Sequence, residues 1–547
     1  MHTRPVPCCH LTRRQLAYLA AASAVPLGTV MDTRRASAAT PRLDPTLVVQ
    51  DLELVTLTET SVVLTWTTST AGTPDATGRL MPRAADTTVL MGTSPAALVE
   101  VYGDNTQTPY HYAEITGLEP GQTYSYVALS NGQPATPAPA FQGNPVGTGP
   151  LDPGAGTPGS PFSFTTPQPP AGRFLFSLAL ANDVHMGETV AGLATSSPQV
   201  GPVPGMGLPP GISGPVDGMP YPEAMARALA ADVRARGAAR TLIAGDITSE
   251  ASRADSLRAK QILDGIGTLG VDYLVARGNH DRSHSPIVDC SPSRVPGVDS
   301  TTFQDCFSDV FGVQDAHTWF RRDVGGLRLL ALDTYEKPGN GGDNGILAAD
   351  QYAFLTDQLS SDPDRPTLVF GHHPITVEST LVNLSPVRFD LDPQQALMIE
   401  QLYAGAPGVF FHQAGHTHRN KRSTGTLAEQ VTFHETAATK EYPGGFSLLR
   451  VHTGGYALNF YKTRSEAARE WSDRTRQEYE GQAAYYTNGT IADRNYVVSR
   501  DLSGLSEPEV ASASLPEAPL ALALPLAAAA VGAGALAARA AVNRARR

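Results

Sequence analysis

Short apolar runs that alternate with helical patterns are the feature that most constrains the fold of this 547-residue chain. Apolar residues recur at helical spacing in residues 222–236 and 252–269. Because strands and helices alternate, we predict an α/β body whose helices cover a sheet. Buried strands are predicted for the apolar runs at residues 174–180, 241–244, 273–276, 327–332 and 368–370.

Later apolar runs follow one another without helical patterns between them, so part of the sheet is predicted to be antiparallel. These runs lie at residues 409–411, 430–433, 446–451 and 456–461. A Gly/Pro-rich stretch at residues 187–218 follows the first predicted strand. Because α/β proteins build their sites from loops at the carboxyl ends of strands, we expect this stretch to shape a site.

The N-terminal region has a different pattern. Residues 47–166 contain short alternating apolar segments with turn signals and no helical pattern. Trp66 ends one of these segments and suits the core of a β-sandwich. A helix at 465–480 is expected to be solvated, because it mixes charges without an apolar stripe. Between the two ends of the chain we therefore predict an all-β sandwich domain at 41–168, the α/β body at 169–465 and a helical or linker segment at 466–514.

Residues 1–40 have the parts of an export signal. Arg13 and Arg14 open an apolar stretch that runs to about residue 31, and Ala36-Ser37-Ala38 follows it. The paired arginines resemble a twin-arginine signal, which is read by an export machinery that carries folded proteins. We therefore predict a bacterial protein exported by this route and located outside the cytoplasm. An Arg/Ala-rich tail without a targeting role is the alternative.

Residues 515–547 combine an uncharged Ala/Leu-rich stretch at 518–538 with four arginines that follow it. About 20 apolar residues can span a bilayer, and trailing arginines favour the cytoplasmic side. We predict a hydrophobic membrane anchor with a basic tail that holds the protein at the cell surface. The alternatives are a soluble Ala-rich tail and a cell-wall sorting signal, although Ala518-Pro519 stands where that signal has Thr-Gly.

Composition excludes two classes of protein. Lys and Arg number 41 against 53 Asp and Glu, and the net charge of −12 argues against polymeric nucleic acid as a partner. Four cysteines in the whole chain exclude a fold built on a disulfide framework. Cys290 and Cys306 could still close one loop by a disulfide outside the cell, with two free thiols as the alternative.

Five polar clusters follow predicted strands of the body, and they carry Asp, Asn and His side chains but no thiol. Such donors suit Mn, Fe, Zn or Co better than a structural Cys-zinc site. Alternate side chains of an extended segment share a face, so Asp183 and His185 are directed to one side, as are His416 and His418. The clusters are Asp183-Val-His185, Gly245-Asp246, Gly278-Asn-His-Asp281, Gly371-His-His-Pro374 and Gly415-His-Thr-His418.

In this order, the motifs D-x-H, G-D, G-N-H-D, G-H-x-P and G-H-x-H resemble the calcineurin-like metallophosphoesterase family over about residues 174–461. The N-terminal module is similar to the sandwich of purple acid phosphatases and to fibronectin type III domains. The resemblance implies a metallophosphoesterase-type β-sheet sandwich flanked by helices and preceded by an all-β sandwich domain. It also implies hydrolysis of phosphate esters.

The resemblance further implies two divalent metal ions and assigns residues to them. His280 would stabilise the transition state or protonate the leaving oxygen. His373 is the alternative to His372 as a ligand, and Asp281 would orient its neighbours. The implied ligands are Asp183, His185 and His418 for one ion, Asn279, His372 and His416 for the other, and Asp246 as the bridge between them.

One position departs from the purple acid phosphatases. In those enzymes the residue three after the bridging Asp is a Tyr that binds ferric iron, whereas this chain has Ser249. Without that tyrosinate, the resemblance implies a dinuclear site for Mn or Fe(II)/Zn and no enforced ferric site.

The clusters and the two ends together predict an exported phosphoesterase that hydrolyses small phosphate esters through a hydroxide held by two metal ions. A cyclic-nucleotide phosphodiesterase or another phosphodiesterase is the alternative within the same class. A surface binding or adhesion protein with a structural metal site is the alternative from another class. The presence of His280 beside a full ligand set favours an enzyme, because a structural site would not need it.

Overall fold

The computed structural model describes residues 43–75, 79–137, 161–191, 211–292, 302–312, 317–339, 341–381, 390–477 and 487–508. The predicted export signal at 1–40 and the predicted anchor at 515–547 lie outside the described residues. The described residues from Asp44 onward belong to one compact unit. Within these ranges, no helix is both long enough and apolar enough to cross a membrane.

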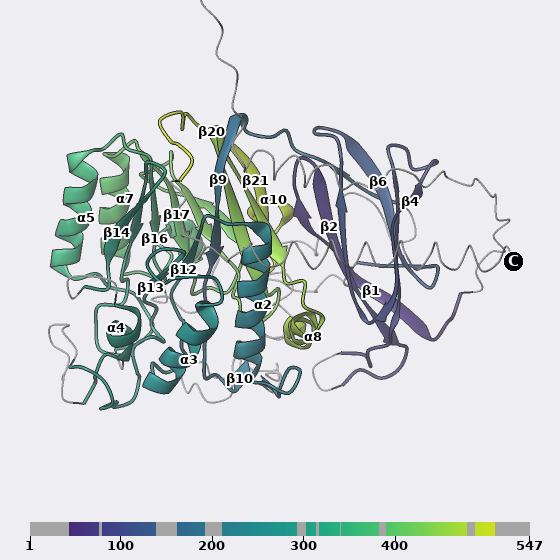
Figure 1. The fold of residues 1–547 in the computed structure, drawn as a ribbon, viewed down its shortest axis with the longest axis horizontal. Coiled ribbons are helices and arrows are strands. Elements are labelled where there is room, and N and C mark those ends of the chain that lie inside the picture. The colour runs from purple at the N-terminus through teal and green to yellow at the C-terminus, as the bar shows by residue number, and fades with distance from the viewer. Residues whose placement is uncertain are drawn as a thin grey trace, which may run out of the picture. The chain divides into compact units, whose positions relative to one another are not determined.

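The N-terminal region is an all-β sandwich of two antiparallel sheets, as predicted (Figure 1). Trp66 of one sheet and Tyr126 of the other lie in a shared apolar core. The first sheet has the order β1-β2-β5, with strands Leu47–Leu57, Ser61–Thr70 and Tyr110–Thr116. The second has the order β4-β3-β6-β7, with β8 beside β6, and consists of β3 (Ala85–Gly92), β4 (Val99–Thr108), β6 (Thr123–Ser130), β7 (Gln133–Pro134) and β8 (Phe162–Thr165).

The α/β body contains two mixed sheets, so the predicted antiparallel part is present. The first sheet has the order β13-β12-β9-β20-β21, and its strands β9, β12 and β13 are parallel. The second has the order β14-β15-β16-β17-β19-β18, and β15, β16, β17 and β19 are parallel. The strands of the first are β9 (Ala171–Ala181), β12 (Arg240–Ala244), β13 (Tyr273–Ala276), β20 (Gly445–Lys462) and β21 (Asn495–Ser499). Those of the second are β14 (Phe320–Val324), β15 (Leu327–Ala331), β16 (Thr367–Phe370), β17 (Val409–Ala414), β18 (Lys421–Thr424) and β19 (Thr432–Glu435), and a separate short pair joins β10 (Val190–Ala191) to β11 (Ile212–Ser213).

Successive side chains of a strand point to opposite faces of its sheet, and in these strands both faces carry apolar side chains. One apolar face of each sheet can therefore pack against the other sheet. Leu178 of β9 and Leu368 of β16 belong to the core between the sheets. Ala179 and Val369, the next residues along, pack instead toward the outer helices. The body is therefore a β-sheet sandwich flanked by helices.

Helices cover the outer face of each sheet (Figure 1). Helices α2 (Tyr221–Arg236) and α3 (Arg253–Leu263) pack on the first sheet, and α5 (Ala349–Ser361) and α7 (Pro393–Ala404) pack on the second. Their ends follow local rules: the Ser252 side chain caps α3 by accepting from the Asp255 amide, and α2 ends at the left-handed Gly237. Shorter helical segments are α4 (Cys306–Phe311), α6 (Val377–Leu381), α8 (Glu466–Arg474), η1 (Thr475–Gln477) and α10 (Ile491–Arg494).

Two expectations about the C-terminal part of the body were wrong. The runs at 446–451 and 456–461 form one strand, β20, which has irregular register near His452 and pairs with β9 and then β21. The helix expected to be solvated is α8, and its Trp471 is fully buried and stacks on Tyr221 with ring centroids 4.1 Å apart. A buried face with so few apolar residues leaves no periodic stripe in the sequence.

Candidate active site

The five polar clusters converge at the carboxyl ends of strands from both sheets. Asp183 and His185 follow β9, Asp246 follows β12, and Asn279 follows β13 in the first sheet. The clusters with His372 and with His416 and His418 follow β16 and β17 in the second. Because parallel strands end at the same edge of a sheet, the fold brings together residues that lie more than 200 positions apart.

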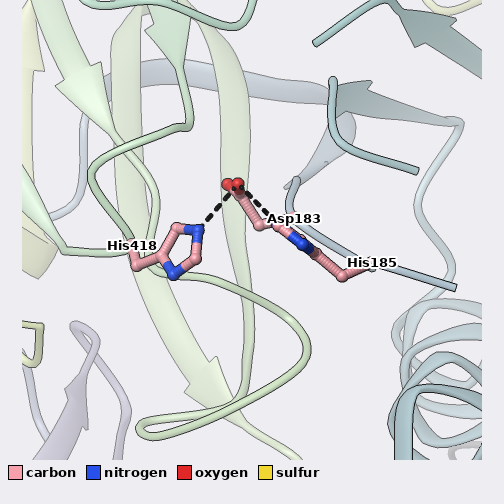
Figure 2. A group of neighbouring side chains, drawn as sticks. All are labelled: Asp183, His185 and His418. Atoms are coloured by element: carbon pink, nitrogen blue, oxygen red, sulfur yellow. Dashed lines mark ion pairs between the residues drawn. The ribbon is translucent and has the colours of Figure 1, made fainter. Parts of the chain in front are cut away.

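The first group consists of Asp183, His185 and His418, whose donor atoms lie within 4.8 Å of one another (Figure 2). Oδ1 of Asp183 lies 3.0 Å from Nε2 of His418 and 3.6 Å from Nε2 of His185. The Asp183 carboxylate therefore stands between the two imidazoles, in an arrangement that can surround one cation.

The second group consists of Asp246, His372 and His416. Nε2 of His372 lies 3.1 Å from Nδ1 of His416 and 3.0 Å from Oδ1 of Asn279. Oδ2 of Asp246 lies 3.1 Å from Nε2 of His372 and 3.3 Å from Nε2 of His185, so this carboxylate faces both groups. The seven ligands named from the sequence are thus brought together in the two predicted sets.

Five of these residues have a left-handed backbone, which is uncommon outside glycine and marks functional turns. They are Asp183, His185, Asp246, His416 and His418, with φ between 48° and 69°. Neighbouring glycines make room for them. A Cβ added to Gly278 would lie 2.1 Å from Oδ1 of Asp246, and one added to Gly245 would lie 2.6 Å from Nδ1 of His372.

The donor atoms fit divalent metal ions. Within the described part of the chain, Oδ1 of Asp183 and both ring nitrogens of His185 are buried and form no hydrogen bond of good geometry. The Nε2 of His185 lies 3.3 Å from Oδ2 of Asp246 and 3.6 Å from Oδ1 of Asp183. Buried polar groups are rarely left unbonded, and converging carboxylate, amide and imidazole donors without thiols suit first-row divalent ions.

The electrostatics of the cluster point the same way. Burial raises the pKa of Asp183 and of Asp246, but neighbouring imidazoles outweigh it and hold both carboxyl pKa values well below their usual range. Burial lowers the pKa of His418 and of His372, yet the facing carboxylates raise them to about 10 and about 9. Two carboxylates held in the anionic form attract cations to this place.

Comparison with known proteins identifies the fold family. Residues 177–420 match the family model described as calcineurin-like phosphoesterase. This part of the chain is therefore similar to the calcineurin-like phosphoesterases. The protein is therefore a metallophosphoesterase, a hydrolase that acts on phosphoric ester bonds. The comparison with curated proteins found no match.

Three solved structures are similar to the chain at low identity. A dimetal phosphatase from Danio rerio has 15% identity and a TM-score of 0.37, over 53% of this chain and 96% of that one. The purple acid phosphatase PPD1 from yellow lupin seeds has 14% identity and a TM-score of 0.35, over 85% and 78% of the two chains. A structure of PhoD has 10% identity and a TM-score of 0.35, over 84% and 92%.

His280 lies beside the two groups in the phosphoesterase site. Its ring centroid is 4.7 Å from that of His185, and its amide donates to Oδ1 of Asp246 at 2.9 Å. Its Nδ1 lies 2.8 Å from the Ser249 carbonyl, which can only accept, so Nδ1 carries a proton. Burial lowers the His280 pKa, and His185 and His284 lower it further against the attraction of Asp246. The Nδ1 bond thereby fixes the orientation of the ring.

The two histidines of the Gly371–Pro374 motif have different surroundings. His372 donates from Nδ1 to the Ala244 carbonyl at 2.8 Å, which leaves Nε2 for a metal ion. In His373, Nδ1 lies 2.7 Å from the Thr334 hydroxyl and Nε2 lies 2.8 Å from the Asp343 carbonyl. Both nitrogens of His373 are thus engaged, and this favours His372 as the ligand.

Asp281 holds the turns on which the ligands stand. Its carboxylate accepts from the amides of Ile247, Thr248 and Gly278 at 3.2, 2.9 and 3.0 Å. It also accepts from the Thr248 hydroxyl at 3.0 Å. These bonds tie the turn that carries Asp246 to the turn that carries Asn279.

Cys290 and Cys306 form a disulfide, with Cα atoms 5.1 Å apart. The neighbouring Asp305 accepts from Arg277 at 3.0 and 2.8 Å, and Arg277 immediately precedes the Gly278 motif. The disulfide therefore closes a loop that contacts the segment carrying Asn279 and His280.

Several residues outside the five motifs surround the site. Glu441 places Oε1 2.5 Å from Nδ1 of His418, and Lys440 donates to both oxygens of Glu188 at 2.6 Å. On the other side, His284 lies between Glu250 and Asp343, with nitrogen–oxygen distances of 3.3 and 3.7 Å. These residues stand outside the five motifs, and their roles depend on contacts between distant segments.

Proposed function

We propose that this chain is an exported metal-dependent phosphoesterase that hydrolyses small phosphate esters with two divalent ions, drawn from Mn, Fe, Zn and Co. The observation that carries the proposal is the Asp246 carboxylate, which faces the His185 group and the His372 group at once. A carboxylate in that position can hold two cations together. The acidic balance of the chain supports a small substrate over polymeric nucleic acid.

In this proposal the chain supplies two cradles and one proton-handling group. Asp183, His185 and His418 bind one ion, and Asn279, His372 and His416 bind the other. When bound, the two ions lower the pKa of the attacking water and neutralise charge on the phosphoryl oxygens. The hydrogen bond from Nδ1 of His280 to the Ser249 carbonyl fixes the ring. Nε2 of His280 then stabilises the transition state or transfers a proton to the leaving oxygen.

The decisive experiment is a metal titration of the chelated protein. We expect hydrolysis of an aryl phosphomonoester to appear as Mn(II) binding reaches about two ions per chain. An aryl phosphodiester assayed beside it tests the phosphodiesterase alternative through the ratio of the two rates. Two bound ions without hydrolysis of either ester would contradict the proposed activity and favour a binding protein with a structural metal site.

A His280→Ala variant separates catalysis from metal binding. We expect metal content close to that of the parent protein and turnover reduced at least tenfold, since general acid–base groups contribute about 100-fold or more. His317→Ala is the matched control, because His317 stacks on Trp319 and has no contact with the cluster. Unchanged turnover in His280→Ala would remove His280 from the mechanism.

Export and anchoring form a separate part of the proposal. The support is the Arg13-Arg14 pair with its apolar stretch and the apolar run at 518–538 followed by arginines. Replacing both Arg13 and Arg14 by Lys should keep the protein in the cytoplasm. A chain that ends before Leu515 should be released in soluble form, and its continued retention by membranes would count against the anchor.

A further inference from the structure

The loop between β19 and β20 runs beside the first group of candidate ligands. The Thr439 amide donates to the Asn182 carbonyl at 3.0 Å, and the Lys440 amide donates to the Asp183 carbonyl at 3.2 Å. These bonds place residues 439–443, which we call the clamp loop, directly on the backbone of Asp183. The loop lies beyond the matched family range of residues 177–420.

Glu441 of the clamp loop fixes the orientation of His418. Oε1 of Glu441 lies 2.5 Å from Nδ1 of His418; Glu441 is fully buried and His418 is partly buried. A carboxylate can only accept, so Nδ1 of His418 donates to Glu441, and this bond turns Nε2 toward Asp183. That Nε2 is the atom that lies 3.0 Å from Asp183, toward the centre of the first group.

Lys440 connects the clamp loop to the second imidazole of the group. It donates to both oxygens of Glu188 at 2.6 Å and lies 3.4 Å from Oε2 of Glu441. Oε1 of Glu188 lies 3.8 Å from Nδ1 of His185. The adjacent residues Lys440 and Glu441 thus lie behind both imidazoles of the first group.

The clamp loop is in turn held by the N-terminal sandwich. The Tyr442 hydroxyl donates to Oε1 of Glu53 at 2.7 Å, and Glu53 belongs to β1 of the sandwich. Glu53 is fully buried and also accepts from Lys462 and from Arg476. A buried carboxylate with three donors is held in one place, so it provides a fixed anchor for Tyr442.

We propose that Glu441 is a positioning residue for His418 and that Glu53 of the β-sandwich secures it through Tyr442. The sandwich is then part of what sets the affinity of the Asp183–His185–His418 site, in addition to any role as a spacer. The inference rests on the proposed function only in taking this group to bind a metal ion. It makes no use of the substrate.

The first experiment compares Glu441→Ala and Glu441→Gln with Glu400→Ala in the full-length protein. Glu400 is a matched control, because it is as buried as Glu441 but belongs to helix α7. Its carboxylate accepts from the Leu427 amide and not from a candidate metal ligand. Mn(II) binding is measured directly, together with ester hydrolysis against Mn(II) concentration. Loss of a carboxylate behind a ligating His weakens metal binding by about 10–100-fold.

We expect Glu441→Ala to lower the affinity for one of the two Mn(II) ions by at least about tenfold and to leave the affinity for the other unchanged. Activity should return at high Mn(II), and Glu441→Gln should be intermediate because its carbonyl can still accept from Nδ1. Glu400→Ala should bind both ions as the parent does. Parent-like binding by Glu441→Ala, or equal weakening of both ions, would overturn the positioning role.

The second experiment tests the sandwich contact with Tyr442→Phe, which removes only the hydroxyl that donates to Glu53. Tyr273→Phe is the matched control. The Tyr273 hydroxyl also donates to a carboxylate at 2.7 Å, that of Asp264, but this hydrogen bond lies outside the site. We expect Tyr442→Phe to lower the affinity for the same Mn(II) ion by about threefold or more. Tyr273→Phe should leave that affinity unchanged. Parent-like binding in Tyr442→Phe would refute the link to the sandwich.

These measurements separate failure of the inference from failure of the proposed activity. A parent protein that binds two Mn(II) ions but hydrolyses no ester contradicts the proposed activity, while the binding comparison among variants still decides the role of Glu441. A parent protein that hydrolyses esters while Glu441→Ala binds both ions normally upholds the activity and overturns the inference.

Discussion

Gly245 offers a sharp test of how tightly the site is built. It follows β12 with φ of +86°, and a Cβ at this position would lie 2.6 Å from Nδ1 and 2.7 Å from Cβ of His372. Gly237, at the end of α2, also has a left-handed backbone, with φ of +66°, but a Cβ there would meet nothing within 4 Å. Gly245→Ala and Gly237→Ala therefore share the backbone strain and differ in the clash.

The structure allows the two costs to be separated. A left-handed residue with a Cβ costs about 1–2 kcal/mol, and both variants should lose this much unfolding free energy. Only Gly245→Ala adds overpacking, which costs about 1–3 kcal/mol more. The same clash moves His372, and a displacement on the order of 1 Å in a catalytic group can reduce the rate about 100-fold.

Denaturant unfolding, Mn(II) binding and ester hydrolysis should be measured on both variants. We expect Gly237→Ala to keep parent-like kcat/KM with slightly lower stability. Gly245→Ala should lose roughly 100-fold in kcat/KM and bind the ion at His372 more weakly. If Gly245→Ala retained the activity of Gly237→Ala, the close approach of Gly245 to His372 would not matter for the site.

Three further predictions concern other parts of the molecule. His372→Ala should lose about one metal ion per chain by elemental analysis, whereas His373→Ala should keep both, because Thr334 and Asp343 already engage its nitrogens. Replacing Cys290 and Cys306 by Ser should lower the unfolding free energy by about 3 kcal/mol, since the disulfide closes a loop between residues 16 positions apart; an unchanged denaturation midpoint would contradict this. Burial raises the Glu53 pKa, but Lys462 and Arg476 outweigh it and hold the pKa at about 2 instead of 4.5. The stabilisation by ionised Glu53 should therefore be complete above pH 4.5 and be lost as the pH falls toward 2. Unfolding of the parent and of Glu53→Gln should be measured across that range. The difference between their unfolding free energies should shrink as the pH falls.

The sequence predicted the strands of the α/β body and the five motifs because both are local signals, whereas the sandwich of two sheets was implied by the family resemblance. Continuous apolar runs such as residues 174–180 indicate buried strands, and each motif follows its strand within a few residues. Parallel strands then bring their ends to one edge without further information. The choice between His372 and His373 could not be read in this way, because it depends on Thr334 and Asp343, which come from a distant segment.

The same distinction explains the missed elements. Strand β21 was not predicted, and helix α8 was predicted without its buried face, which packs on the distant helix α2 through Trp471 and Tyr221. The clamp loop residues Lys440 and Glu441 belong to no periodic pattern and act through side-chain contacts with Glu188 and His418. Such contacts are fixed by packing, and packing appears only after the sheets are assembled.

The strained turns connect the stability of the body to the chemistry of the site. Asp183, Asp246 and His418 keep left-handed backbones that are less costly for Asp and His than for branched residues but still unfavourable. They persist because the surrounding bonds determine them: Asp281 ties together the turns after β12 and β13, and the clamp loop amide of Lys440 bonds to the Asp183 carbonyl. These bonds come from the protein's own residues, so the packed sheets hold the turns that carry the ligand set. Substitutions in the supporting bonds should therefore act on metal affinity first and on global stability second.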